Sequence, residues 1–446
     1  MIHGKTLALV AAVAGLAGCG EDPLSTGASP ILYEPMRLDS APVCTESSHR
    51  GTFRLQLSPV LAVDDAGRAV AAWRQCDGHG LRVAAAWFDG KRWSRPTTLG
   101  RTPAIAPVAA LSRAAGMIFW RETPDGQDPT AAYYSLLDER RGWSETRRFE
   151  PSDDIVVMTA LDGGRTLVWS GGRPRSTLRA SRFRPERGWT PAQAPRHHDD
   201  YLTYSHVVGD AAGNALAVFV GPDPGGTSDV QRPWVVRFDA QTGWDSPRPL
   251  DTAPRARAVD PTPALNEEGE GYVAWEDGYQ AIQVARYTRG RGWTPPMRLD
   301  TGVSPRFSHP DVIDLSADAR GGAHLLWEQA GELEILATRL AEGGQEGTSV
   351  VLGQGHSARV IARPDGAALA AWQGYDTGRE PSSIHVRRYV VGRGWTSPET
   401  FTGAGGRIRE FESRSVQMGV DGQGQAFLLW VEDNAGRDEV WVRRFR

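Results

Sequence analysis

The chain has 446 residues, a formal net charge of −4 and a pI of about 6.2. This balance gives no basic surplus for nucleic acid, and no run of Lys and Arg marks a membrane-binding patch. Hydrophobic residues make up 40% of the chain, enough for a packed core, so disorder is excluded as the default. The counts of 51 Gly, 30 Pro and 16 Trp favour many tight turns between short strands.

Residues 1–18 have the pattern of a signal peptide. Their apolar stretch, 6–18, is shorter than the roughly 20 residues that a membrane-spanning helix needs. Leu16-Ala17-Gly18-Cys19 matches a bacterial lipobox, in which the Cys is lipidated and becomes the new N-terminus. We therefore predict lipidation at Cys19 and a membrane-anchored protein. An ordinary signal peptide that happens to contain a Cys is the alternative.

Residues 19–30 are small, polar and rich in turn formers, which is typical of a flexible tether. Gly20 and Glu21 lack the Asp signal that retains some lipoproteins at the inner membrane, so an outer membrane is favoured. After export, Cys44 and Cys76 remain in an oxidising compartment and are predicted to form a disulfide. Two unpaired thiols are the alternative.

One unit repeats along most of the chain. A small residue, alternating apolar residues and a closing aromatic recur about every 50 residues, which indicates propeller blades rather than a helical solenoid. Because the small residue lies four positions before the aromatic, both share one face of a strand. The closing aromatics are Trp73, Trp120, Trp169, Phe219, Trp275, Trp327, Trp372 and Trp430.

Each complete unit has the pattern of four short antiparallel strands. An Asp-x-x-Gly or Asn-x-x-Gly turn precedes the strand that ends in the aromatic. A third strand follows, as at 282–287, and a Gly-Trp pair such as Gly142-Trp143 opens the fourth. The sixth unit has lost this Trp and keeps only an apolar run within 342–352. The turns begin at Asp64, Asp210, Asn266, Asp318 and Asp421.

The last unit stops at Arg446, before its fourth strand. The missing part occurs at the other end of the chain, because residues 35–38 repeat Pro-Met-Arg-Leu of residues 296–299. We therefore expect the N-terminal strand to pair beside Trp441 and close the circle, which hides the sheet edges. The prediction is an all-β fold, a β-propeller of eight four-stranded blades over 31–446. Seven blades plus a degenerate half-unit is the alternative.

Three stretches, 88–99, 287–299 and 389–401, resemble the Asp-box turns of sialidase-type propellers, Ser-x-Asp-x-Gly-x-Thr-Trp. Asp89-Gly90 is the nearest match to the Asp and Gly of the box, and most other units lack the Asp. The resemblance covers nearly the whole mature chain, but it concerns architecture and implies little about activity. The Trp of the box is matched by Trp93, Trp143, Trp189, Trp244, Trp293 and Trp395.

Sialidases carry three arginines for the substrate carboxylate, a Tyr/Glu nucleophile pair and an acidic residue. No local motif places these groups here, so we predict no catalytic residue. The stretch 196–201 contains His197 and His198 among possible metal donors, but adjacent residues of an extended chain point in opposite directions. No metal site and no cofactor is therefore expected.

One face of the predicted propeller receives the long, irregular loops and is the expected binding face. Polar residues follow the closing aromatics there, and the links between blades add more. Solvated loop charge without a ligand is the alternative. The candidate binding residues are Arg74, Arg121, Glu276, Glu328, Gln373, Glu432, Arg306 and His309.

Three functions compete at this stage. The first is a lipid-anchored envelope module that binds a glycan or an envelope protein. The second is a glycoside hydrolase or lyase related to the sialidases, for which two carboxylates about 5–10 Å apart would be expected. The third is a structural envelope protein without a small ligand. The anchor, the regular frame and the missing catalytic motif favour the first.

Overall fold

The computed structural model describes the chain in short stretches, and within them every regular element is a β-strand. The strands form antiparallel sheets, so the fold is all-β and propeller-like. The signal peptide, the tether, Cys19 and Cys44 lie outside the described residues, and the lipid anchor and the disulfide stay predictions. The described residues are 34–39, 59–76, 81–100, 104–112, 115–122, 131–150, 157–161, 165–171, 177–195, 203–210, 212–222, 230–254, 256–278, 281–299, 310–329, 333–342, 347–374, 383–402, 407–408, 416–434 and 437–445.

Four sheets occupy the first part of the described chain. The first contains β2 (Val60–Val63), β3 (Ala69–Cys76), β4 (Leu81–Phe88) and β5 (Thr97–Leu99). The second contains β6 (Ala104–Ser112), β7 (Ala115–Glu122), β8 (Ala131–Asp138), β9 (Gly142–Trp143) and β10 (Arg147–Arg148). The third contains β11 (Val157–Leu161), β12 (Thr166–Gly171), β13 (Thr177–Arg184) and β14 (Gly188–Trp189). The fourth contains β15 (Thr203–Gly209), β16 (Ala215–Gly221), β17 (Arg232–Asp239), β18 (Gly243–Trp244) and β19 (Arg248–Pro249).

Three further sheets complete the described strands. One contains β20 (Ala258–Leu265), β21 (Gly271–Asp277), β22 (Ile282–Thr288), β23 (Gly292–Trp293) and β24 (Met297–Arg298). An eight-stranded sheet contains β25 (Pro310–Ala317), β26 (Ala323–Gln329), β27 (Glu334–Leu340), β28 (Val350–Ala362), β29 (Ala368–Gly374), β30 (Ser383–Val390), β31 (Gly394–Trp395) and β32 (Glu399–Thr402). The last contains β33 (Arg407–Ile408), β34 (Gln417–Val420), β35 (Ala426–Asn434), β36 (Arg437–Phe445) and β1 (Met36–Arg37).

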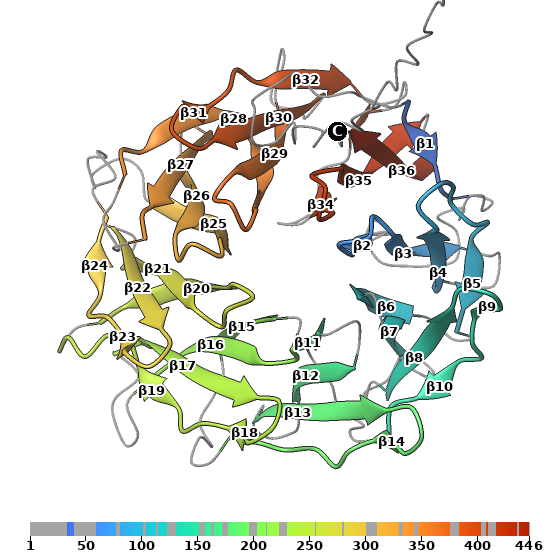
Figure 1. The fold of residues 1–446 in the computed structure, drawn as a ribbon, viewed down its shortest axis with the longest axis horizontal. Coiled ribbons are helices and arrows are strands. Elements are labelled where there is room, and N and C mark those ends of the chain that lie inside the picture. Colours follow the sequence, from blue (N-terminus) through green and yellow to red (C-terminus); the bar gives the residue numbers. More distant parts are fainter. Residues whose placement is uncertain are drawn as a thin grey trace, which may run out of the picture.

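The sheets follow one another around a circle, each with its first strand towards the centre (Figure 1). β1, the first described strand of the chain, lies next to β36, the last. Met36 pairs with Val442 and Arg37 with Trp441, and the Leu38 amide donates to the Val440 carbonyl at 2.8 Å. The N-terminal segment therefore lies beside Trp441, where its sequence predicts it.

The circle has two ends of different character. We call the end that carries the Asp-x-x-Gly turns and the Gly-Trp turns the turn end. The strands that close on the aromatics begin at this end and run to the opposite one, which we call the loop end. Because neighbouring strands are antiparallel, the links between sheets also lie at the loop end.

The closing tryptophans belong to the core. Five of the closing tryptophans, Trp73, Trp120, Trp327, Trp372 and Trp430, are fully buried, and Trp169 and Trp275 are 1% exposed. Each lies in a cluster that joins two neighbouring sheets; Trp120, for example, packs with Val70 and Ala72 of the preceding sheet. The closing tryptophans are therefore packing residues of the core.

The small residue four positions before each aromatic lets backbones approach one another. At Gly271 a Cβ would overlap the carbonyl oxygen of Ala264 in the paired strand β20. Gly116 lies against the side chains of Leu111 and Leu137. A larger residue at either position would push neighbouring strands apart.

The Asp-x-x-Gly turns form as their sequence predicts. The Asp318 carboxylate accepts the backbone N–H groups of Arg320 at 2.8 Å and Gly322 at 2.9 Å. The Gly321 amide donates to the Asp318 carbonyl, and Gly321 has a φ of +78°, which only glycine adopts without strain. The turns at Asp64, Asp210, Asn266 and Asp421 repeat these bonds.

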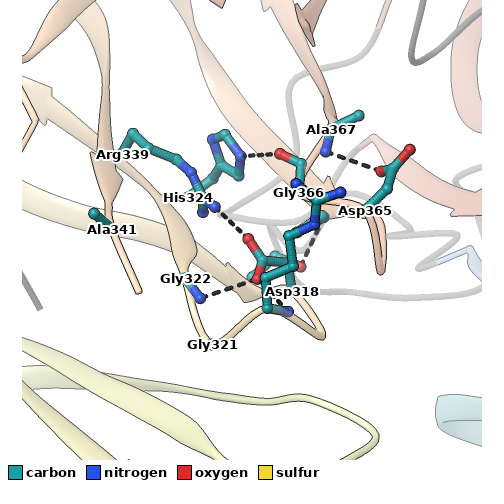
Figure 2. A network of polar contacts seen from close by, with 12 residues as sticks. Asp318, Gly321, Gly322, His324, Arg339, Ala341, Asp365, Gly366 and Ala367 are labelled. Atoms are coloured by element: carbon teal, nitrogen blue, oxygen red, sulfur yellow. Dashed lines mark hydrogen bonds and ion pairs between the residues drawn. The ribbon is translucent and has the colours of Figure 1, made fainter. Parts of the chain in front are cut away.

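These turns also make contacts with side chains of other strands, as Figure 2 shows around Asp318. The Arg339 guanidinium forms an ion pair with the buried Asp318 carboxylate. His324 Nε2 lies 3.2 Å from the Gly366 carbonyl of the next turn along the chain. Between sheets, the Asn266 side-chain amide donates to the Asp318 carbonyl at 2.8 Å, so polar contacts also hold adjacent sheets together at the turn end.

The Gly-Trp turns contain more aspartates than the Asp-box comparison suggests. Besides Asp89, the carboxylates of Asp138 and Asp239 each accept two backbone N–H groups of their own turn at 2.8–2.9 Å. These hydrogen bonds hold the pKa of all three carboxyl groups below their usual value. Asp138 and Asp239 escape a motif search because their turns lack the Gly of Asp89-Gly90.

Candidate functional site

Six of the eight candidate binding residues lie at the loop end of the circle. They stand one or two positions after the closing Trp in β3, β7, β21, β26, β29 and β35. The other two, Arg306 and His309, lie outside the described residues, as do His197 and His198.

Successive residues of these strands face different sheets. Phe119 packs in one cluster with Trp169 of the next sheet, whereas Trp120 packs with Val70 of the preceding sheet. Side chains alternate along a strand, so Arg121 faces the next sheet with Phe119, and Glu122 faces the preceding sheet with Trp120. The same alternation holds in the other sheets, because each closing Trp clusters with the preceding sheet.

At the loop end, two positions therefore face each interface between neighbouring units. One is the residue directly after the closing aromatic of the first unit, and the other is the residue two positions after the closing aromatic of the following unit. These pairs differ from interface to interface, although the frame repeats. They are Arg74 with Glu122, Arg121 with Gly171, Glu276 with Gln329, Glu328 with Gly374, and Gln373 with Glu432. The repeat thus supplies positions, and each interface has its own polar chemistry.

Most of these groups are walled in between sheets rather than solvated. Glu276, Gln373 and Glu432 are 2%, 0% and 1% exposed. Burial lowers the pKa of Arg74 and Arg121 from its usual value, although an arginine stays charged at neutral pH. Glu276, Gln373 and Glu432 are therefore shielded from water, whereas Arg74, Arg121 and Glu328 are partly exposed.

Buried indole N–H groups have partners in the units that carry a Glu or Gln two positions after the Trp. Of these Glu and Gln residues, only Glu432 is among the candidate binding residues predicted from the sequence. The bonds run from Trp73 to Gln75 at 3.2 Å, from Trp120 to Glu122 at 2.7 Å and from Trp430 to Glu432 at 2.8 Å. The signal in the sequence is Trp-x-Glu or Trp-x-Gln, whose spacing of two puts both side chains on one face. Trp327 departs from it, because its indole donates to Thr338 at 3.1 Å although Gln329 stands at this spacing.

Among the units that close on Trp, two have Gly at that position, Gly171 after Trp169 and Gly374 after Trp372. Their indole nitrogens are buried and have no hydrogen-bond partner in the described part of the chain. At Trp372 the vacant position is filled by His385, which stacks on the indole at 5.3 Å between ring centroids, and a Cβ at Gly374 would overlap it. Among the described residues, no imidazole stacks on Trp169 in this way.

The central strands are irregular near the loop end. A β-bulge is one extra residue in one strand of a pair. It redirects side chains and bends the strand, and bulges are frequent beside binding sites. Within the bulges, Asp260 and Ser357 have positive φ angles of 42° and 55°. The register shifts lie between Ile105 and Val108, Thr203 and His206, Val259 and Thr262, Val312 and Asp314, and His356 and Arg359.

One bulge brings an imidazole to a candidate residue. His356, at the start of the bulge in β28, has its Nδ1 3.4 Å from a carboxylate oxygen of Glu328 in the preceding unit. A pattern search would not find this contact, because the two residues belong to different units and meet only across an interface.

Among the described residues, no group of three or more His, Cys, Asp or Glu side chains is placed to hold a metal ion. In the same stretches, no helix is long and apolar enough to cross a membrane. Cys76 ends β3 at the loop end, and its predicted partner Cys44 lies outside the described residues.

No family model matches the chain, and no curated protein matches it. Similar solved structures include a polysaccharide lyase described as an ulvan lyase, with a TM-score of 0.44 and 12% identity over 75% of this chain and 89% of that one. A trans-sialidase from Ruminococcus gnavus has a TM-score of 0.36 and 14% identity, over 71% and 90%. Prolyl oligopeptidase B from Galerina marginata has a TM-score of 0.47 and 9% identity, over 92% and 56%. Likenesses this remote carry no statement about activity.

Proposed function

We propose that the chain is a lipid-anchored β-propeller of the bacterial cell envelope that binds a glycan or a protein through its loop end. The observation that carries the proposal is the set of different polar pairs between sheets at that end, on a frame that otherwise repeats. Polar residues that vary from unit to unit are not needed to hold a repeating frame together, whereas a binding site needs a few polar groups placed for its ligand.

We count eight blades in this propeller, with β1 as the outer strand of the last. β28 supports the count, because Val350–Gln354 pairs with β27 and Gly355–Ala362 pairs with β29, so the eight-stranded sheet divides into two units. Contacts between the last and first units support closure. The Gly422 amide donates to the Asp65 carbonyl at 3.2 Å, and Leu38 and Phe427 share a cluster with Trp73.

The position of the tether fits this function. β1 runs from the turn end to the loop end, because it is antiparallel to β36, and Glu34 therefore lies at the turn end near Arg443. A lipid on Cys19 would hold the turn end towards the membrane. The loop end would then face away from the bilayer, where a glycan or an envelope protein can reach it.

Binding is tested with the mature chain carrying Cys19→Ala, probed against envelope glycans and envelope proteins. We expect a ligand whose affinity falls at least about tenfold in Glu276→Gln, which keeps the shape of a buried loop-end side chain and removes its charge. Glu267→Gln, at an exposed residue of the turn end, is the matched control and should bind normally. Uniformly negative screens would contradict the proposal, and turnover of a glycan would favour the hydrolase or lyase instead.

A further inference from the structure

The Gly-Trp turns, with the equivalent turn before Trp93, place positive charge along the outer edge of the turn end. Nine exposed Arg or Lys residues stand in five of these turns, between the third and fourth strands of their units. Because they come from separate units, the sequence contains no run of positive charge, and only the fold gathers them at one end. We call these nine residues the basic rim; they are Lys91, Arg92, Arg140, Arg141, Arg184, Arg187, Arg289, Arg291 and Arg393.

The acids of the Gly-Trp turns are fewer and are partly held by the backbone. Five Asp or Glu residues stand in these turns. The carboxylates of Asp89, Asp138 and Asp239 each accept two backbone N–H groups of their own turn at 2.8–2.9 Å. Arg92 Nε lies 3.9 Å from a carboxylate oxygen of Asp89, yet the Arg92 side chain stays 88% exposed. The positive side chains therefore reach the solvent, whereas three of the five carboxylates are engaged within their turns.

The turns of the basic rim stand clear of the rest of the protein. A Cβ at Gly90, Gly290 or Gly392 would meet nothing within 4 Å beyond its chain neighbours. In the inner turns, by contrast, a Cβ at Gly67 or Gly321 would touch side chains of other strands. The outer turns therefore project into open space, whereas the inner turns pack against neighbouring strands.

Negative charge at the turn end lies nearer the centre of the circle. The exposed acids of the inner turns include Asp65, Glu267 and Glu268. The positive charge is thus spread along an outer rim rather than gathered in one pocket. Such an arrangement suits a broad anionic surface better than a single small anion.

The chain enters the frame within this rim. Glu34 lies at the turn end near Arg443, before the outer strand of the last unit. The units that pack against the last one on its two sides both carry basic turns, with Arg393 on one side and Lys91 on the other (Figure 1). A lipid on Cys19 would therefore bring the rim against the headgroups of the same bilayer and raise its effective concentration there.

One turn of the rim also presents an apolar side chain. Val391 is 47% exposed and is one of four large hydrophobic residues that are exposed among the described residues. It stands two positions before Arg393, in the turn where Gly392 projects into open space. An exposed apolar residue beside a cation is typical of surfaces that lie at the boundary between headgroups and acyl chains.

We propose that the basic rim binds the anionic headgroups of the bilayer that holds the lipid anchor, so that the turn end docks on the membrane rather than being only tied to it. The inference rests on the anchor and the orientation of the proposed function and adds a second contact to them. Each Arg or Lys near an anionic bilayer strengthens binding about fivefold, and salt screens this attraction.

Binding to vesicles without the anchor is the first test. The mature Cys19→Ala chain is sedimented with vesicles of equal parts phosphatidylglycerol and phosphatidylcholine, or with vesicles of phosphatidylcholine alone. We expect binding to the anionic vesicles, little binding to the neutral ones, and a loss of binding as salt rises. The triple variant Arg92→Gln, Arg291→Gln and Arg393→Gln should bind the anionic vesicles at least about tenfold more weakly.

The matched control removes three exposed arginines from outer strands, by Arg147→Gln, Arg248→Gln and Arg298→Gln. Each of these residues pairs with the half of its third strand, β8, β17 or β22, that starts at the loop end. Both triple variants change the net charge equally, so the control should bind nearly as well as the parent chain. Equal weakening of the two would show attraction by net charge alone and overturn the role of the rim.

Lys91 reports the contact directly, because it is the only lysine after residue 18. The Cys19→Ala chain is saturated with vesicles and treated with an amine-reactive reagent, and the peptide that contains Lys91 is followed by mass spectrometry. We expect slower modification on anionic vesicles than on neutral ones. The same rate on both would show that Lys91 does not meet the bilayer and would overturn the docking.

Soluble alginate, an anionic polysaccharide, distinguishes a membrane from a soluble polymer. Alginate that binds the parent chain and not the rim variant, without binding to vesicles, would assign the rim to a polymer and overturn the membrane contact. If a glycan or an envelope protein still binds the loop end in that case, the proposed function stands while the docking is refuted. If the rim binds anionic vesicles and the loop end binds nothing, the docking stands and the proposed binding function is refuted.

Discussion

At the scale of single residues, the position three residues before each closing aromatic takes side chains of different chemistry in different units. Tyr272 and His324 hold this position in adjacent units. The Tyr272 hydroxyl donates to the Gly321 carbonyl at 2.7 Å, and His324 Nε2 donates to the Gly366 carbonyl, since a carbonyl only accepts. Both bonds run to the turn of the next unit. Leu216 fills the same position elsewhere, so the bond is an addition to the packing rather than a requirement of the repeat.

The protonation of His324 links stability to pH. Burial, reinforced by the positive charge of Arg339, lowers the His324 pKa to about 3, while Gly366 and Asp318 oppose the shift; Tyr389 and Trp395 cover the ring. The unfolded chain binds the proton near pH 6.5 and the folded chain does not, so stability is present above pH 6.5 and is lost as pH falls towards 3. We expect the His324 contribution to fall by about 1.4 kcal/mol per pH unit in this window.

The check is a comparison with His324→Leu, which copies Leu216. Urea unfolding of both proteins is measured at pH 7.5, 6 and 5, and the slope of unfolding free energy against pH should be shallower in the variant. The carboxylates titrate equally in both chains, so the difference between the two slopes reports the protonation of His324. Parallel slopes would show that His324 does not resist protonation.

The buried Asp318 carboxylate supports a second prediction. Asp318→Ala removes two backbone hydrogen bonds of the turn and leaves the largely buried Arg339 without its ion pair. We expect a loss of about 3 kcal/mol of unfolding free energy. Asp210→Ala removes the same turn bonds beside the neutral Asn214 and should cost only about 1 kcal/mol. Equal losses in denaturant melts would contradict the role given to Arg339.

At the scale of elements, β1 shows how a two-residue strand can matter more than its length. Arg37 forms hydrogen-bonded ion pairs with Glu439 at 2.6 Å and Asp39 at 2.9 Å, and Asp39 in turn accepts the Val440 amide at 3.1 Å. Leu38 is buried in the cluster shared by the first and last units. The strand therefore covers the edge of β36 and adds apolar contacts across the join.

Removal of β1 is the corresponding experiment. A chain lacking residues 20–39 should melt at least about 5 °C below a chain lacking only 20–33, because the ion pairs and the burial of Leu38 are lost. It should also associate through the uncovered edge of β36, which light scattering after gel filtration would detect. A truncated chain that stays monomeric and melts normally would refute the role of β1.

At the scale of the whole molecule, the two ends of the circle differ in how regularly their residues repeat. The turn end repeats the same Asp and Gly chemistry in unit after unit. Side chains of Asn266 and Tyr272 donate from there to the turn of the neighbouring sheet. The loop end carries bulged central strands and polar pairs that differ between interfaces. Stability and recognition are thus separated along the axis of one frame, as the proposed binding role requires.

The proposed orientation on the membrane is tested with fluorescent labels on lipidated protein in liposomes. Arg140→Cys lies exposed at the turn end, and Asn434→Cys lies exposed at the loop end. A quencher attached to lipid headgroups should dim the label at Arg140→Cys and leave that at Asn434→Cys unchanged. Equal quenching would contradict the orientation, and protein that fails to bind liposomes would contradict lipidation at Cys19.

The sequence by itself determined the repeat, the turns that begin at residues such as Asp64 and Asp318, and the burial of the closing tryptophans. These features depend on neighbours within a few positions: period-two alternation sets the strands, and Asp and Gly set the turns. Only the tertiary structure decided which groups from different units meet, such as His356 with Glu328 or Phe149 with Trp169. Contacts of that kind depend on strand register, bulges and the spacing of sheets, which arise when distant segments pack together, and no local pattern encodes them.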